Sequence, residues 1–121
     1  MIKGIGVDNI EVSRIEKTIK NYGERFLNRI YTKKEIEYCI KKPHAAEHFA
    51  ARFAAKEAFG KALGAGVFYK FSWKDVEVTR HSSGKPEIKY TGYFKDKLKG
   101  NIFLSLTHTS KEAIAVVVIE E

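Results

Sequence analysis

The spacing of hydrophobic residues changes half-way along the chain. In the first half they recur every three or four positions, as in helices, and in the second half they alternate or form short apolar runs, as in strands. Three helices are predicted: one that starts near Glu11, one from about Lys33 to Lys41, and one from Ala45 to Leu63. The predicted strands are Ile2–Val7, Asp75–Arg80, Glu87–Tyr90, Ile102–His108 and Ala113–Ile119. This segregation predicts an α+β domain with antiparallel strand pairing.

Polar residues and glycines mark the ends of these elements. Ser13 and Glu16 have the spacing of a helix capping box. Ser82 to Pro86 forms a turn between two strands, and Gly64 to Gly66 suits the end of the long helix. Asp8 lies where the first strand ends, a position from which it could also cap the next helix.

Two predicted strands differ in how their apolar residues are arranged. From Ile102 to His108, alternate residues share one face, which His108 closes. From Ala113 to Ile119 both faces are apolar, and one small domain has difficulty covering both. The last strand therefore favours an oligomer.

Length and composition narrow the class of protein. The 121 residues predict one domain, residues 1–121. The chain has no apolar run of membrane length and no signal-like N-terminus, so we expect a cytoplasmic protein without a membrane partner. A single cysteine, Cys39, leaves oxygen or histidine ligands for any metal site. The net charge of +7 favours an anionic partner such as nucleic acid, a phosphorylated cofactor or an acidic protein.

The long helix carries a glutamate among its apolar residues. Phe49 and Phe53 belong to an apolar stripe at helical spacing, Glu57 falls on the same stripe, and Lys61 follows one turn later near its edge. Because a buried acid needs a partner, Glu57 is a candidate functional residue. The alternative is an exposed Glu57–Lys61 pair worth about 0.2–0.5 kcal/mol.

Three familiar site motifs do not fit. The segment from Gly4 starts like a dinucleotide fingerprint, but Asn9 stands where the third glycine belongs. The segment ending in Gly60-Lys61 resembles a phosphate-binding loop but lacks its first glycine and its Ser or Thr. His44 and His48 are four residues apart and could share a metal, yet two ligands alone do not make a site.

Two carboxylates remain as a candidate site. Asp8 and Glu57 could supply oxygen ligands to Mg²⁺, which keeps water molecules and usually takes its other ligands from substrate phosphates. The positive charge of Lys61 would then attract the same phosphate group. Spacing alone permits the helix-capping role of Asp8 equally well.

Five segments of the chain carry a resemblance to a known family. They are Gly4–Glu16 (GIGVDNIEVSRIE), Arg52–Gly66 (RFAAKEAFGKALGAG), Phe71–Val78 (FSWKDVEV), Ser83–Pro86 (SGKP) and Ser105–Thr109 (SLTHT). In this order they resemble the 4'-phosphopantetheinyl transferase superfamily, in particular its small bacterial type, the holo-[acyl-carrier-protein] synthases. Asn9 and Thr109 depart from the usual pattern. The resemblance implies an antiparallel sheet packed against a long central helix.

The resemblance also implies a reaction. The 4'-phosphopantetheine arm of coenzyme A, a substrate, would pass to a serine of apo acyl carrier protein, with release of adenosine 3',5'-bisphosphate, in support of fatty acid biosynthesis. Asp8 and Glu57 would hold Mg²⁺ against the pyrophosphate, and Lys61 would neutralise charge on the transferred or leaving phosphate. The proton acceptor stays open between a carboxylate, a metal-bound water and the substrate phosphate.

The same resemblance assigns contacts with coenzyme A. The residues concerned are Arg52, Lys61, Gly64, Lys85, Pro86 and His108. Arg52 and Lys85 would bind the 3'-phosphate or neighbouring groups, His108 would contact the nucleotide, and Gly64 would let the backbone approach the adenine end. An isolated strand histidine and a helix-terminating glycine also have purely structural explanations.

A basic cluster in the first third of the chain is a candidate docking surface. Arg14, Arg25, Phe26 and Arg29 combine cations with an aromatic side chain, and acyl carrier proteins are strongly acidic. A solvated charged face is the alternative. The resemblance further implies a homotrimer with active sites at the subunit boundaries.

Two other functions compete with the transferase. A small nucleic-acid-binding module would use the positive charge together with aromatic residues such as Tyr22, Tyr69, Phe71 and Trp73. A non-catalytic binder of coenzyme A or nucleotides would retain ligand without turnover. The nucleic-acid-binding module has no need for acids at Asp8 and Glu57. The transferase is favoured over both alternatives, so we expect no nucleic-acid partner.

Overall fold

A computed structural model describes residues 1–64 and 72–121. The helices are α1 (Val12–Tyr22), α2 (Glu24–Ile30), α3 (Lys33–Ile40) and α4 (Ala45–Leu63), with two short 3₁₀ turns, η2 (Trp73–Asp75) and η3 (Gly92–Phe94). The strands are β1 (Ile2–Glu11), β2 (Val76–Arg80), β3 (Pro86–Tyr90), β4 (Asn101–His108) and β5 (Glu112–Glu120). Four residues with predicted roles lie outside the described residues: Ala65 and Gly66 at the end of the long helix, and Tyr69 and Phe71 in the alternative nucleic-acid-binding surface.

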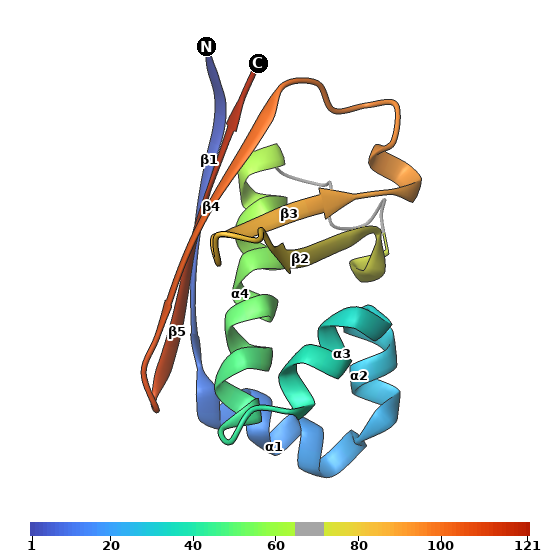
Figure 1. Ribbon diagram of the computed structural model, residues 1–121, viewed down its shortest axis with the longest axis vertical. Coiled ribbons are helices and arrows are strands. Elements are labelled where there is room, and N and C mark those ends of the chain that lie inside the picture. The colour runs from blue at the N-terminus through green and yellow to red at the C-terminus, as the bar shows by residue number, and fades with distance from the viewer. Residues whose placement is uncertain (65–71) are drawn as a thin grey trace.

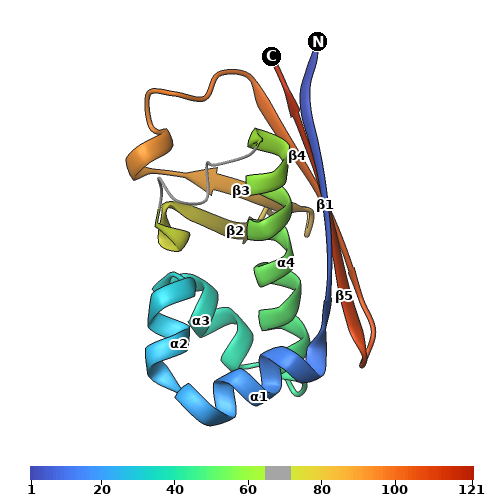
Figure 2. The same ribbon diagram turned by 180° about the vertical axis from the view of Figure 1, so that it is seen from behind.

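Helix α4 forms the centre of the molecule (Figure 1). The antiparallel sheet β1–β5–β4 lies along one side of it, and the antiparallel hairpin β2–β3 lies on the other, with α1, α2 and α3 gathered towards the N-terminal end of α4 (Figure 2). The chain ends meet at one end of the sheet (Figure 1), where the Met1 amino group donates to the Glu121 carbonyl oxygen at 2.7 Å. The predicted α+β fold with an antiparallel sheet against a long central helix is confirmed.

Helix α4 is buried around most of its circumference. Phe49, Ala54, Ala58 and Phe59 are all fully or nearly fully buried, because the sheet and the other helices surround them. Phe53 and Glu57 are only half-buried, and Lys61 is exposed. The predicted apolar stripe is therefore only partly buried: Phe49 packs in the core, whereas Phe53 and Glu57, one and two turns later, lie towards a more open side of the helix. Glu57 lies at an accessible surface beside the core.

Two glycines of β1 allow α4 to approach the sheet closely. A Cβ added at Gly6 would lie 1.9 Å from the Ala58 carbonyl oxygen, and one at Gly4 would lie 1.9 Å from that of Ala62. Both neighbours are helix backbone and cannot rotate away. The glycines that resemble a dinucleotide fingerprint thus serve helix–strand packing.

We expect Gly6→Ala to lower the free energy of unfolding by about 3 kcal/mol or more, because the added methyl group forces helix and strand apart. Urea denaturation followed by circular dichroism measures the loss. Lys95→Ala is the control, since Lys95 is exposed near η3, away from the sheet and α4. Equal stability of Gly6→Ala and the native protein would contradict this role.

The first strand is longer than predicted. β1 continues to Glu11 because its register with β5 extends through Asp8↔Ala115 to Glu11↔Glu112. Asp8 therefore lies within a strand, and both its position at a strand end and its alternative role as a helix cap are wrong. The N-cap of α1 is Glu11, which makes no side-chain capping bond, so the predicted Ser13–Glu16 capping box is also wrong.

Other differences concern the helices. The described part of the chain has four helices where three were predicted, because Gly23, with φ +53°, turns the chain and starts the seven-residue α2. The capping box that is present joins Thr32 and Glu35 at the start of α3. The bounds of α4 match the prediction, and Gly64, with φ +107°, ends it as expected. Among the described helices, none is both long and apolar enough to cross a membrane.

Candidate active site

The fold brings Asp8, Glu57 and Lys61 together. Asp8 comes from β1, and Glu57 and Lys61 lie one turn apart on α4. The Lys61 ammonium nitrogen Nζ lies 3.0 Å from Asp8 Oδ1 and donates to the Val7 carbonyl oxygen at 3.2 Å. The Asp8 side chain is only 14 % exposed, whereas that of Lys61 is 51 % exposed. An acid at the floor of the site thus faces a mobile cation at its rim.

The environment of Glu57 disfavours its negative charge. Its pKa is raised from the ordinary value, chiefly by burial and then by the charge of Asp8, while Lys61 acts in the opposite direction. The two carboxylates are therefore close enough to repel each other. A cation between them would relieve this repulsion.

The chemistry of these donors fits Mg²⁺. Asp8 and Glu57 offer only oxygen atoms, and residues 1–64 and 72–121 contain no group of three or more His, Cys, Asp or Glu side chains able to hold a metal. Mg²⁺ typically binds one or two carboxylates and completes its coordination with water and substrate phosphates. His44 is the N-cap residue of α4, whereas the ring of His48 lies against His108.

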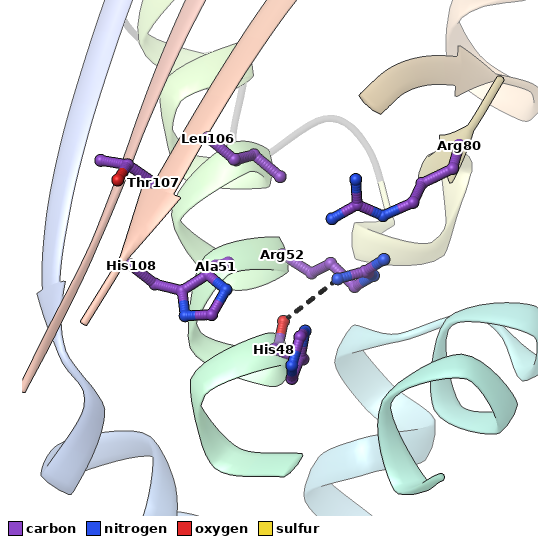
Figure 3. A pocket seen from close by; sticks show the side chains of 7 residues that line it. All are labelled: His48, Ala51, Arg52, Arg80, Leu106, Thr107 and His108. Carbon is purple, nitrogen blue, oxygen red and sulfur yellow. Dashed lines mark hydrogen bonds between the residues drawn. The ribbon is translucent and has the colours of Figure 1, made fainter. Parts of the chain in front are cut away.

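A second cluster surrounds a pocket of about 260 Å³ (Figure 3). Its lining residues are His48, Ala51, Arg52, Arg80, Leu106, Thr107 and His108. The side chains of Arg52 and His108, both predicted to contact coenzyme A, point into the same space. The pKa of His48 is lowered, first by burial and then by the charges of His108 and Arg52, so the pocket is electropositive.

His108 is held from the side of α4. Its Nδ1 lies 3.0 Å from Glu47 Oε1, and its ring meets the ring of His48 edge-on with centroids 5.0 Å apart. The alternation of β4 places Leu104 and Leu106 on the same inward side of the strand. Glu47 therefore fixes the orientation of His108 at the pocket.

The remaining predicted coenzyme A residues lie at two loops. Lys85 is exposed and Pro86 half-buried at the turn between β2 and β3, and Gly64 is exposed at the end of α4. The Arg80 guanidinium joins this turn to the pocket, because its Nη1 donates to the Gly84 carbonyl oxygen at 2.8 Å. The structure thus brings Arg52 and His108 together and ties the Lys85 turn to them.

The predicted docking residues border a groove between α1 and α2. Arg25, Phe26 and Arg29 line it together with Thr18 and Tyr22. Arg14 is exposed on α1, one turn before Thr18, but does not line the groove. Three of the four predicted residues therefore share one concave surface.

Residues 4–117 match the sequence profile of the 4'-phosphopantetheinyl transferase superfamily. The chain belongs to this superfamily. Among its relatives, the holo-[acyl-carrier-protein] synthase of Geobacter sp. (strain M21) is 47 % identical, with 99 % of each chain covered. That of Koribacter versatilis (strain Ellin345) is 45 % identical over the full length of both chains.

Solved structures of other superfamily members share the fold. The holo-(acyl-carrier-protein) synthase of Bacillus anthracis str. Ames, in complex with CoA (3',5'-ADP), has a TM-score of 0.84 at 37 % identity, covering 100 % of this chain and 98 % of that one. The Neisseria meningitidis synthase has a TM-score of 0.89 at 32 % identity, with both chains fully covered. The Helicobacter pylori synthase in complex with coenzyme A has a TM-score of 0.85 at 32 % identity, covering 96 % and 99 %.

Sequence reasoning about this transferase missed several residues near the two clusters. Lys56, which precedes Glu57 on α4, forms a fully buried ion pair with Glu35, with Lys56 Nζ 2.7 Å from Glu35 Oε1. Arg80, which lines the pocket, donates to the Tyr38 hydroxyl, and Glu47 supports His108. Lys56 directly follows Ala54 and Ala55 in the Ala-rich helix α4. A lysine among these small apolar residues was the one signal in the sequence that pointed to a buried charge. The other contacts join distant segments and leave no local pattern.

Proposed function

We propose that this protein transfers the 4'-phosphopantetheine arm of coenzyme A to a serine of apo acyl carrier protein, releases adenosine 3',5'-bisphosphate and so supports fatty acid biosynthesis in the cytoplasm. The observation that carries the proposal is the convergence of Asp8, Glu57 and Lys61 in a chain that aligns over its full length with holo-[acyl-carrier-protein] synthases. In the reaction, the serine oxygen bonds to the β-phosphorus of coenzyme A. The bond to the bridging oxygen breaks, and the bisphosphate leaves with its electron pair. The serine hydroxyl gives up its proton to one of three acceptors: a carboxylate, a metal-bound water or the substrate phosphate.

Asp8, Glu57 and Lys61 perform the electrostatic part of this reaction. Asp8 and Glu57 would hold Mg²⁺, which when bound would supply positive charge for the pyrophosphate oxygens. Lys61 leaves its contact with Asp8 to pair with a phosphate oxygen, which its partly exposed side chain permits. Because the charge develops on the leaving phosphate, cations held there favour the transition state.

The electropositive pocket receives the nucleotide end of coenzyme A. Arg52 and His108 contact it, while Lys85 and Pro86 lie in the β2–β3 turn that Arg80 ties to the pocket, and Gly64 lies at the C-terminal end of α4. Arg52 offers paired donors to a phosphate group, and His108 presents the ring edge that Glu47 does not occupy. This arrangement anchors the substrate away from the reacting phosphorus.

Intact-mass spectrometry tests the proposal. Apo acyl carrier protein incubated with this protein, coenzyme A and Mg²⁺ should gain one phosphopantetheinyl group, and the gain should disappear when a chelator removes the metal. Unchanged mass with several carriers, despite binding of coenzyme A, would mean a binder without transferase activity.

The groove between α1 and α2 docks the acidic carrier. Arg25 and Arg29 flank the half-buried Phe26, so charges surround an aromatic anchor. We expect Arg25→Glu or Arg29→Glu to raise the KM for the carrier about tenfold, because like charges then oppose each other, while the affinity for coenzyme A stays unchanged.

Steady-state kinetics with varied carrier and isothermal titration with coenzyme A measure the two effects. Arg14→Glu should follow the same trend, since Arg14 lies on the adjoining surface of α1. Lys95→Glu is the matched control, because Lys95 is exposed near η3, outside the groove. Equal losses of carrier and coenzyme A recognition would contradict a separate docking surface.

The outer face of the β1–β5–β4 sheet is the subunit interface of a homotrimer. Ile5, Val7, Phe103 and Val116 are 61 %, 55 %, 45 % and 37 % exposed, and in both views no element lies over this face (Figures 1 and 2). An apolar sheet face of this kind is covered by another copy in the assembled protein. One face of β5 then packs in the core of the subunit, and the other packs against the neighbouring subunit.

We expect light scattering to give three times the mass of the chain. Val116→Asp should shift the protein towards monomer, because it buries a charge at the centre of the interface. Ile40→Asp is the matched control, since Ile40 is 63 % exposed on α3, away from the sheet. A monomeric native protein would contradict the assembly.

A further inference from the structure

Tyr38 joins two guanidinium groups beside the coenzyme A pocket. The Arg52 guanidinium carbon lies 4.1 Å from the centroid of the Tyr38 ring, and the Tyr38 hydroxyl accepts a hydrogen bond of 2.9 Å from Arg80 Nε. Arg52 and Arg80 come from α4 and β2, and Tyr38 comes from α3. Figure 3 shows both guanidiniums near each other at the pocket.

Neither guanidinium has an acidic partner within residues 1–64 and 72–121. Arg52 is 2 % exposed, its Nε has no hydrogen-bond partner, and its Nη1 makes only a long contact of 3.5 Å with the His48 carbonyl oxygen. Arg80 donates to Tyr38 and to the Gly84 carbonyl oxygen. A buried charge without a partner is costly, which applies to Arg52, and the exposed Arg80 adds a second positive charge at the same pocket, so the two call for a ligand of high negative charge.

The environment of Tyr38 reflects these charges. Partial burial raises the pKa of its hydroxyl, but the hydrogen bond from Arg80 and the charges of Arg80, Arg52 and Lys42 outweigh burial, and the pKa is lowered overall. The ring covers Arg52 while the oxygen binds Arg80, so one side chain fixes both cations. Tyr38 thus orients the two cations but leaves their positive charges unneutralised.

We propose that Tyr38 is a positioning residue that holds Arg52 and Arg80 as a pair for a phosphate monoester dianion, and that Arg80 thereby determines specificity for coenzyme A over its 3'-dephospho form. The inference rests on the proposed function for the identity of the monoester. A monoester carries two negative charges and three terminal oxygens, which two guanidiniums can bind together. A phosphodiester or an unphosphorylated ribose lacks these features.

Three variants separate positioning from packing. Tyr38→Phe keeps the ring over Arg52 and removes only the acceptor for Arg80. Arg80→Ala removes the second cation, and the double variant tests whether the two act as a unit. Tyr90→Phe is the matched control, because the Tyr90 hydroxyl donates to the Leu98 carbonyl oxygen, outside the pocket.

The readouts are kcat and KM with coenzyme A and with 3'-dephospho-coenzyme A. Tyr38→Phe should raise the KM for coenzyme A about tenfold, the effect of a hydrogen bond to a charged group, with little change in kcat or in the KM for the dephospho form. Arg80→Ala should give at least this loss, and the double variant should equal Arg80→Ala. Equal changes with both substrates, or additive losses, would overturn the proposal.

Titration with adenosine 3',5'-bisphosphate and with adenosine 5'-monophosphate keeps this inference distinct from the proposed function. Should the protein transfer nothing yet prefer the bisphosphate in a Tyr38-dependent manner, the transferase fails and the positioning role stands. Should it transfer phosphopantetheine while Tyr38→Phe retains the native preference, the positioning role fails alone.

Discussion

Replacing Glu57 with glutamine is expected to lower the rate of phosphopantetheine transfer roughly 10²–10³-fold, a loss typical of removing one electrostatic element of an active site. The amide keeps the size of the side chain but removes the charge that, in the proposed mechanism, attracts a divalent cation together with Asp8. The rate is measured by intact mass of the carrier at saturating coenzyme A. Glu37→Gln is the matched control, since Glu37 is exposed on α3.

The same variant should be more stable than the native protein in metal-free buffer at neutral pH. The pKa of Glu57 is raised above 4.5 by burial and by Asp8, so its contribution to stability is present below the ordinary pKa and is lost as pH rises through the raised value. Thermal unfolding with and without Mg²⁺ measures this difference. A variant that keeps more than a tenth of the native rate, or that loses stability, would contradict the assigned role.

Replacing Lys56 with methionine is expected to lower the free energy of unfolding by about 3–5 kcal/mol, because it leaves the charge of Glu35 buried without a cation. Burial lowers the pKa of Lys56, and the ion pair with Glu35 opposes that shift. The ammonium group also donates to the carbonyl oxygens of Ile30, Trp73 and Val76 at 2.9, 3.0 and 2.7 Å. One side chain therefore joins α4 to the end of α2, to η2 and to β2.

Urea denaturation measures the effect, and Lys3→Met provides the matched control. The Lys3–Glu121 pair is 3.7 Å long and exposed, so its loss should change stability by less than about 1 kcal/mol. Adding Glu35→Leu to Lys56→Met should recover part of the loss, because the unpaired carboxylate disappears. Similar losses for Lys3→Met and Lys56→Met would contradict the structural importance of the buried pair.

Local patterns predicted the elements whose ends carry strong signals. Helix α4 lies between Pro43 and Gly64, and both residues disfavour helix continuation, so its bounds were predictable. Alternation and turn residues located β2 to β5 within one residue. The end of β1 and the short helix α2 were not predictable, because pairing with β5 and the backbone turn at Gly23 decide them.

In the candidate site, too, some residues were predictable from sequence patterns and others were not. Helical spacing and the strand identified Glu57, Lys61 and Asp8, although the reasons given for Glu57 and Asp8 were partly wrong. Family resemblance was needed for Arg52 and His108. The support from Tyr38 depends on contacts between α3, α4 and β2, which only the folded chain brings together.

Anomalous diffraction from crystals grown with coenzyme A and Mn²⁺ in place of Mg²⁺ tests the central claim most directly. We expect one manganese peak with carboxylate oxygens of Asp8 and Glu57 among its ligands and with the pyrophosphate of coenzyme A beside it. Manganese bound elsewhere, with neither Asp8 nor Glu57 as a ligand, would contradict the assignment of these residues as the catalytic metal site.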